Sequence, residues 1–177
     1  MPTYIYQDFT AQGINVKALM SLYAELEKNN SDRPTLTPIV VFMAFSIESY
    51  LNSLGSRALD IWDDLERLPW KKKIEILHKT VGKKADWGAA SLQFATEVFK
   101  LRDKLAHGKP ERILSEPDQG NVHYSALTPD WYKHITKEWV IEAKDRFTKL
   151  MVYLGKLFEL HESDHLMLST GGALVED

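Results

Sequence analysis

The chain has 177 residues, of which 44% are hydrophobic and 27% charged, the size and composition of one globular domain with an ample core. Its net charge of -3 predicts no overall attraction to nucleic acid, so a nucleic-acid site would have to be a local basic patch. It has no cysteine, which excludes disulfides, thiol nucleophiles and cysteine metal ligands, and we expect a cytoplasmic protein.

The N-terminal residues Met1 to Phe9 mix polar and aromatic side chains, and no basic region leads into an apolar run. This pattern predicts no signal peptide. The longest apolar run, Ile39 to Phe45, is too short to span a bilayer, so we expect no membrane association. We expect a single domain over residues 1–177, with its core between about residues 14 and 160.

The first half of the chain has helical periodicity. Apolar residues repeat at helical spacing between Ile14 and Lys28. Thr37 has the character of an N-cap and Pro38 that of a first helical residue, so a second helix is expected from there to Gly55. Because this helix is apolar on most faces, it is predicted to be central in the fold.

The middle of the chain predicts three further helical segments. Residues Leu59 to Leu65 form a short helical turn, and Pro69 opens a helix that continues to about Lys79. Ser91 to His107 has a strong apolar stripe, and Gly108 is placed to cap that helix at its C-terminus.

The last third begins with the irregular, proline-containing stretch Lys109 to Asp130, in which Val122 to Leu127 could form a short strand. Trp131 to about Leu160 is expected to be the longest helix. His161 to Asp177 is polar and is expected to be a flexible tail. Four to five main helices in one domain predict an all-α fold, an antiparallel helical bundle.

The most distinctive chemistry lies in Arg102-Asp103-Lys104-Leu105-Ala106-His107, near the end of a predicted helix. Asp103 and His107 are four residues apart and share a helix face, whereas Arg102 is about 140° from His107 but long enough to reach around. Histidine transfers protons near neutral pH and arginine grips phosphate, so these groups could cleave RNA. The same spacing also fits a solvated Asp103–His107 pair favoured by the helix C-terminus.

The run Phe99 to Lys109 resembles the signature helix of the HEPN superfamily, in which arginine is followed by a polar residue, a few further residues and then histidine, often with glycine after it. Phe45 to Asn52 is similar to the earlier helix of that family, which carries polar residues towards the site. Leu68 to Leu77 is similar to its intervening helix, so the resemblance extends over about Thr37 to Lys109.

This resemblance implies a HEPN-like bundle and, as in many HEPN domains, a metal-independent endoribonuclease that needs no cofactor. Its site would form at a homodimer interface where two signature helices face each other. Arg102 would hold the phosphate, His107 would act as general acid or base, and Asp103 would orient His107. The RNA 2′-hydroxyl would attack the adjacent phosphate and leave a cyclic phosphate end.

The resemblance also implies biological settings and an alternative. An active member could be a toxin or phage-defence component with an antitoxin partner. Other HEPN domains are non-catalytic interaction or nucleotide-binding modules beside a nucleotidyltransferase-type partner. The presence of both Arg102 and His107 favours the active interpretation.

Two polar residues on the apolar second helix are candidate supporting groups. Glu48 and Asn52 are one turn apart, and a carboxylate there is costly unless it is paired. They could support Arg102, or they could form a structural ion pair or an exposed stripe. The candidate RNA-binding lysines beside the motif are Lys100, Lys104 and Lys109.

The densest basic region is Lys71 to Lys73, with Lys79, Lys83 and Lys84 close behind. It could contact an RNA backbone, although charge runs of this kind are more often a solvated face. The five tryptophans are more typical of core or interface anchors than of base-stacking platforms.

The segment His161 to His165 matches H-E-x-x-H, in which two histidines on one helix face bind zinc beside a glutamate base. Its intervening Ser163 and Asp164 are polar, and little chain remains to supply a third ligand. A polar helix end or tail is therefore favoured over a zinc hydrolase, and no metal site is expected.

Overall fold

The computed structural model describes residues 3–28, 33–114, 127–167 and 169–175. In these ranges the prediction of an all-α protein is confirmed. The α-helices are α1 (Ala11–Lys28), α2 (Arg33–Ala58), α3 (Trp62–Leu65), α4 (Trp70–Thr80), α5 (Ala90–His107), α6 (Asp130–Lys133) and α7 (Lys137–Lys156). A 3-10 helix, η2 (Asp164–Leu166), and two strands, β1 (Thr3–Phe9) and β2 (Ser169–Val175), complete the described elements.

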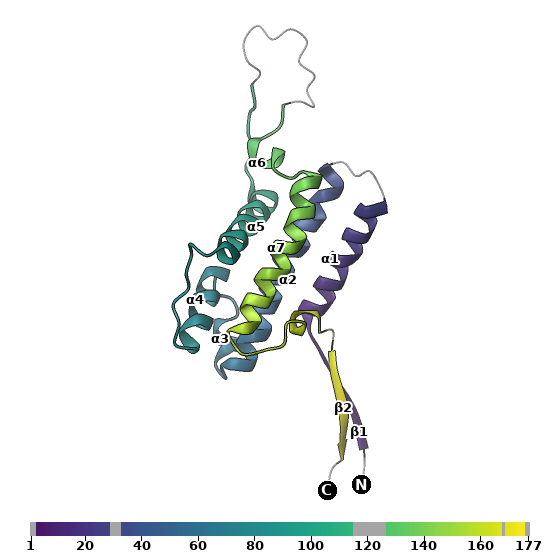
Figure 1. Ribbon diagram of the computed structural model, residues 1–177, viewed down its shortest axis with the longest axis vertical. Helices are drawn as coiled ribbons and strands as arrows, with labels where there is room; N and C mark the ends of the chain where they lie inside the picture. The colour runs from purple at the N-terminus through teal and green to yellow at the C-terminus, as the bar shows by residue number, and fades with distance from the viewer. Residues whose placement is uncertain (1–2, 29–32, 115–126, 168, 176–177) are drawn as a thin grey trace.

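Helix α2 is the central element, as its composition predicts, because α1, α4, α5 and α7 all contact it. Figure 1 shows α1, α2, α5 and α7 lying side by side, with the chain reversing direction from each to the next. By length and composition alone, Leu36–Ala58 could also cross a membrane, but 61% of its apolar window is buried inside the protein. Packing on several sides accounts for the apolar character of this helix.

The start and the end of α2 both differ from the prediction. The helix begins at Arg33, so Pro38 lies inside it rather than at its first position. Pro38 is exposed, and its missing N–H leaves the carbonyl one turn earlier without a helical partner. Gly55 does not end the helix, which continues to Ala58. A Cβ at Gly55 would lie 2.1 Å from the Trp62 ring, so glycine is required there for close packing against α3.

Gly55→Ala should therefore destabilise the protein by about 1–3 kcal/mol, even though alanine is the better helix former. The indole of Trp62, itself buried, would have to move to make room. The free energy of unfolding in urea measures the effect. Ser56→Ala, one residue along on the exposed side, is the control, and equal stability of the two variants would contradict this explanation.

Helices α4 and α5 agree with the prediction. Pro69 directly precedes α4, and α5 ends at His107 with Gly108 as its C-cap. The backbone N–H of Gly108 donates to the carbonyl of Lys104 at 3.0 Å, and a Cβ on Gly108 would lie 2.3 Å from that same oxygen. Glycine thus lets the chain turn sharply away directly after His107.

The single helix expected from Trp131 to Leu160 is wrong. The chain forms α6 and α7, which are separated by a turn at Ile135, a fully buried side chain. Thr136 caps α7 by accepting a hydrogen bond from the backbone N–H of Trp139 at 3.2 Å. The strand expected over Val122 to Leu127 lies outside the described residues, apart from Leu127.

The flexible tail expected from His161 is also wrong for the described residues. Asp164 and His165 are buried in η2. The Asp164 carboxylate accepts two hydrogen bonds from the Arg57 guanidinium, at 3.0 and 2.8 Å, and one from the Tyr50 hydroxyl at 2.9 Å. Polar composition suggested a solvated tail, but these partners satisfy the buried carboxylate.

The two strands form an antiparallel ribbon, in which Thr3 pairs with Val175 and Phe9 with Ser169. Figure 1 shows this ribbon projecting from the end of the bundle where α1 begins, with the Thr3–Val175 pair at its far end. The η2 segment therefore fastens the base of the ribbon to the helices, and the Thr10 hydroxyl adds a 2.7 Å hydrogen bond to the Met167 carbonyl.

The η2 segment should make stability depend on pH. Burial lowers the pKa of His165 below its ordinary 6.5, and the hydrogen bond from Arg57 lowers the pKa of Asp164. Both groups bind protons less readily in the folded than in the unfolded state, so their contribution is complete above about pH 6.5. This contribution to stability is lost on acidification, first as the pH falls to the folded-state pKa of His165 and then as it falls to that of Asp164.

We expect the melting temperature to fall between pH 7 and pH 5, and His165→Asn to reduce that slope because its side chain does not titrate. Thermal unfolding across this range measures both slopes. Identical slopes for wild type and variant would rule out His165 as the titrating group.

Candidate functional site

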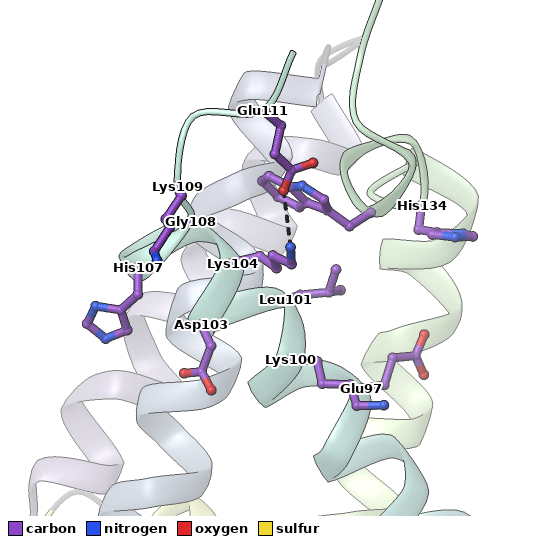
Figure 2. Close-up of a pocket in the computed structure, with 11 residues that line it drawn as sticks. Glu97, Lys100, Leu101, Asp103, Lys104, His107, Gly108, Lys109, Glu111 and His134 are labelled. Atoms are coloured by element: carbon purple, nitrogen blue, oxygen red, sulfur yellow. Dashed lines mark hydrogen bonds and ion pairs between the residues drawn. The ribbon is translucent and has the colours of Figure 1, made fainter. Parts of the chain in front are cut away.

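The C-terminal end of α5 carries most of the predicted site residues. Five of them line a cavity of about 760 Å³ at this end: Asp103, His107, Lys100, Lys104 and Lys109. Figure 2 shows this region, with the Lys104 ammonium directed to the Glu111 carboxylate at 3.1 Å. A cavity of this volume is large enough for a nucleotide-sized ligand.

Arg102 does not line this cavity. Its guanidinium lies 3.6 Å from Oε2 of Glu48 and 3.4 Å from Oδ1 of Asp103, over the ring of Phe99 at 5.3 Å. Charge-assisted hydrogen bonds are typically about 2.7–2.9 Å, and within the described part of the chain Arg102 makes none. Arg102 is therefore oriented by two carboxylates. Its Nε is buried without a partner, so only the terminal guanidinium nitrogens of this 23% exposed side chain could reach a phosphate.

Glu48 serves two cations at once. Its Oε1 accepts a 3.0 Å hydrogen bond from the Lys73 ammonium, while its Oε2 faces Arg102. The Lys73 side chain is only 2% exposed, and an ammonium so deeply buried is costly unless a carboxylate compensates it. In the structure Glu48 therefore lies beside Arg102 and also forms an ion pair with the buried Lys73.

Asn52 does not lie at the end of α5 with the other predicted site residues. It lines a separate cavity of about 290 Å³ together with Ser49, Ser53 and Trp62. Among the residues described, no hydrogen bond joins Asn52 to Arg102 or Glu48, and its Oδ1 is buried without a partner. The structure therefore does not bring the two predicted supporting residues to the same site.

His107 stands apart from the other motif residues. It lies in the last turn of α5, it is exposed, and in the described ranges no hydrogen bond or ion pair joins it to Asp103. Asp103 pairs with Arg102 instead. Figure 2 shows the His107 imidazole pointing outward, away from the Lys104–Glu111 pair. In one chain, therefore, Arg102 lies between two carboxylates, and the exposed His107 lies apart from it at the same end of α5.

Besides Leu101 and Gly108, four further residues of the cavity were not predicted as site residues: Glu97, Glu111, Trp131 and His134. Glu97 accepts hydrogen bonds from Trp139 at 2.6 Å and from Arg146 at 2.7 Å, so it joins α5 to α7. Trp131 and His134 reach the site because the turn between α6 and α7 brings them beside α5. No local sequence signal indicates that placement.

The zinc hypothesis requires His161 and His165 on one face of an α-helix. The segment instead forms turns and the short 3-10 helix η2. His161 is exposed and hydrogen-bonds the Ser163 hydroxyl, whereas His165 is buried. The helical geometry on which that hypothesis depends is absent from this described segment.

The end of α5 therefore combines a partly exposed guanidinium held beside two carboxylates, an exposed imidazole and a lysine-lined cavity. Such groups can bind a phosphate, stabilise its negative charge and transfer a proton. No protein-family model, curated protein or solved structure matches this chain.

Proposed function

We propose that the chain is a HEPN-like, metal-independent endoribonuclease that acts as a homodimer. The observation that supports this most is the state of Arg102, which two carboxylates orient without using its hydrogen-bond donors. The exposed His107 lies at the end of the same helix, beside a cavity lined by lysines. A HEPN-like arrangement of the antiparallel bundle is part of this proposal.

In the proposed reaction the RNA 2′-hydroxyl attacks the adjacent phosphorus and loses its proton to a base. The bond from phosphorus to the 5′-oxygen breaks, and that oxygen takes up a proton. The products are a 2′,3′-cyclic phosphate and a 5′-hydroxyl, so no external oxidant or water is consumed. His107 serves as the proton-transfer group and Arg102 stabilises the extra negative charge on the phosphate in the transition state.

The geometry assigns Asp103 a different role from the one expected. It was expected to orient His107, but its carboxylate lies with the Arg102 guanidinium. We infer that Asp103 and Glu48 position Arg102. Lys100 and Lys109 are exposed at the cavity and would attract the RNA backbone.

The separation of His107 from Arg102 in one chain is our reason for proposing a homodimer. A second α5 facing the first would place another imidazole near the phosphate held by Arg102, so that one histidine acts as base and the other as acid. Activity per chain should then fall in parallel with dimer content on dilution, as followed by sedimentation velocity. Full activity of the monomer would reject this arrangement.

RNA cleavage in EDTA by wild type, Arg102→Ala and His107→Ala tests the proposed function. Wild type should cleave, and both variants should lose activity. Arg67→Ala and His161→Ala, which alter exposed residues away from the α5 end, are matched controls and should cleave normally. Equal activity of all five proteins, or a requirement for metal, would refute the proposal.

A second function has one observation in its favour. Glu48 and Asp103 already flank Arg102, an arrangement that would also suit a non-catalytic HEPN-like interaction or nucleotide-binding module. This alternative predicts no RNA cleavage by the purified protein and recovery with a nucleotidyltransferase-type partner. The ribonuclease proposal also includes a cytoplasmic location, a role in toxicity or phage defence, and an antitoxin partner.

A further inference from the structure

Three neighbouring cavities that share lining residues form a path along α4 and α5. The cavity of about 760 Å³ at the α5 end shares Glu97 and Lys100 with a second, of about 430 Å³. The second shares Trp87 with a third, of about 490 Å³, which lies beside the end of α4. We call this path the basic track, because seven lysines line it: Lys71, Lys79, Lys83, Lys84, Lys100, Lys104 and Lys109.

The basic track carries an excess of positive charge in a chain whose net charge is -3. Four carboxylates line it against seven lysines, and each carboxylate already has a cationic partner. Those pairs are Glu75 with Lys72, Glu97 with Arg146, Glu111 with Lys104, and Asp103 with Arg102. Three of these partners lie outside the track lysines, so most of the lysine charge is left for an anionic ligand.

Most of the track lysines have no ion pair of their own. In the described part of the chain this holds for every track lysine except Lys104, and all six of these lysines are exposed: Lys71, Lys79, Lys83, Lys84, Lys100 and Lys109. Lys73, by contrast, is buried against Glu48 and is structural. The basic run in the sequence thus contains the buried Lys73, Lys72 paired with Glu75, and surface lysines that have no ion pair among the described residues.

Two tryptophan side chains line the cavities together with these lysines. Trp87 lines two of the three cavities and is half-buried, and Trp131 lines the third. Lys71 lies over Trp87 at 5.3 Å, and Trp87 meets Trp70 edge to face at 5.8 Å. Bases of a single strand stack on such rings whatever their sequence, while lysines hold the phosphates.

The aromatic groups also connect the track to the candidate site. Trp70 stacks on Phe99 with ring centroids 4.3 Å apart, and the Arg102 guanidinium lies 5.3 Å above Phe99. Asp103, the ion-pair partner of Arg102, lines the cavity at the end of the track. A strand following the track would therefore arrive at the end of α5 where Arg102 and His107 lie.

We propose that the basic track binds single-stranded RNA, with bases on Trp87 and Trp131 and phosphates on the lysines, and guides the strand to Arg102 and His107. This inference rests on the proposed function, because it identifies single-stranded RNA as the substrate class. A duplex fits less well, since its base faces are stacked on each other and closed to tryptophan.

The test measures binding separately from cleavage. A fluorescein-labelled 2′-O-methyl RNA of about 12 nucleotides has no free 2′-hydroxyl to attack phosphorus, so fluorescence anisotropy reports binding alone. Lys83→Ala/Lys84→Ala should weaken binding and reduce its salt dependence, since about 0.7 counterions are released per phosphate contact. The charge-matched control is Lys17→Ala/Lys28→Ala on α1, which Figure 1 shows on the far side of α2 from α4, and it should bind like wild type.

Trp87→Leu should weaken binding on the order of 10-fold, and Trp87→Phe should recover most of the loss because phenylalanine still stacks. Recovery by phenylalanine distinguishes stacking from general damage to the fold, since Trp87 also packs against the core. Binding that is unchanged in the lysine and Trp87→Leu variants would overturn the proposal. So would equally tight binding of duplex RNA, or displacement by polyglutamate as effective as by unlabelled RNA.

The two proposals fail in different ways. Track-dependent binding by a protein that does not cleave unmodified RNA would support single-strand binding and reject the ribonuclease. Cleavage that depends on Arg102 and His107 but is insensitive to the track variants, with unchanged binding, would support the ribonuclease and reject the track.

Discussion

Arg102→Lys should lower the rate of RNA cleavage by about 10²- to 10³-fold, and Arg102→Ala by at least as much. Lysine keeps the charge beside Glu48 and Asp103 but cannot form the two parallel hydrogen bonds by which a guanidinium grips phosphate. Single-turnover cleavage rates in EDTA measure the loss, and thermal unfolding shows whether the fold is retained.

The Lys variant distinguishes phosphate binding from general charge. If Arg102 acted only as a positive charge, lysine would restore cleavage to near the wild-type rate. His107→Ala should cost about 10²- to 10⁴-fold, and the double variant Arg102→Ala/His107→Ala far less than the product of the two single effects. Independent, multiplying effects would contradict a site in which the two residues act together.

Asp164→Ala should lower the free energy of unfolding by about 2–3 kcal/mol, a large part of the stability of a single domain. The substitution removes both hydrogen bonds from Arg57 and the one from the buried Tyr50 hydroxyl. Arg57 is 41% exposed, so its guanidinium can form hydrogen bonds with water instead. The Tyr50 hydroxyl is buried and would be left without a hydrogen-bond partner. Urea unfolding measures the loss.

The same change should loosen the chain around η2. Hydrogen exchange should quicken at residues 164–167 and at the start of α1, because the Gln12 side chain also bonds the Asp164 carbonyl at 3.2 Å. Glu162→Ala breaks an ion pair with Lys156 that is exposed on both sides, and should change neither stability nor exchange measurably. Equal effects of the two variants would show that burial of Asp164 is unimportant.

The parts of the fold that the sequence predicts well depend on local signals. Pro69 and Gly108 mark the start of α4 and the end of α5, because proline fixes φ before the first turn and glycine has no Cβ to clash with the Lys104 carbonyl. The break between α6 and α7 was missed because no proline or glycine occurs between Trp131 and Val140, and the break shows only in the turn where Ile135 is buried. Local periodicity cannot distinguish one continuous helix from two helices joined by a turn.

The prediction of a flexible tail from His161 was wrong for a different reason. Asp164 finds Arg57 and Tyr50 more than 100 residues earlier in the chain, and no local pattern reports so distant a pairing. Composition alone therefore suggested solvent exposure. Neither strand of the β1–β2 ribbon was predicted, because each depends on the other end of the chain.

The candidate site was predictable in part. A carboxylate on the most apolar helix requires a cation, which is why Glu48 could be connected with Arg102 before the structure was known. Burial of Lys73 against the same carboxylate was not predicted, because its neighbours Lys71 and Lys72 are exposed and the run looks uniform. The positions of Trp87 and Trp131 in the cavities follow from tertiary packing alone.

The chemistry of the cut ends tests the central claim most directly. RNA treated with wild-type protein in EDTA should carry 2′,3′-cyclic phosphate and 5′-hydroxyl ends, and a single 2′-deoxynucleotide should block cleavage at its own 3′ phosphate. His107→Ala should produce neither end. Ends bearing a 5′-phosphate and 3′-hydroxyl, or cleavage beside the 2′-deoxynucleotide, would contradict attack by the 2′-hydroxyl and with it the proposed function.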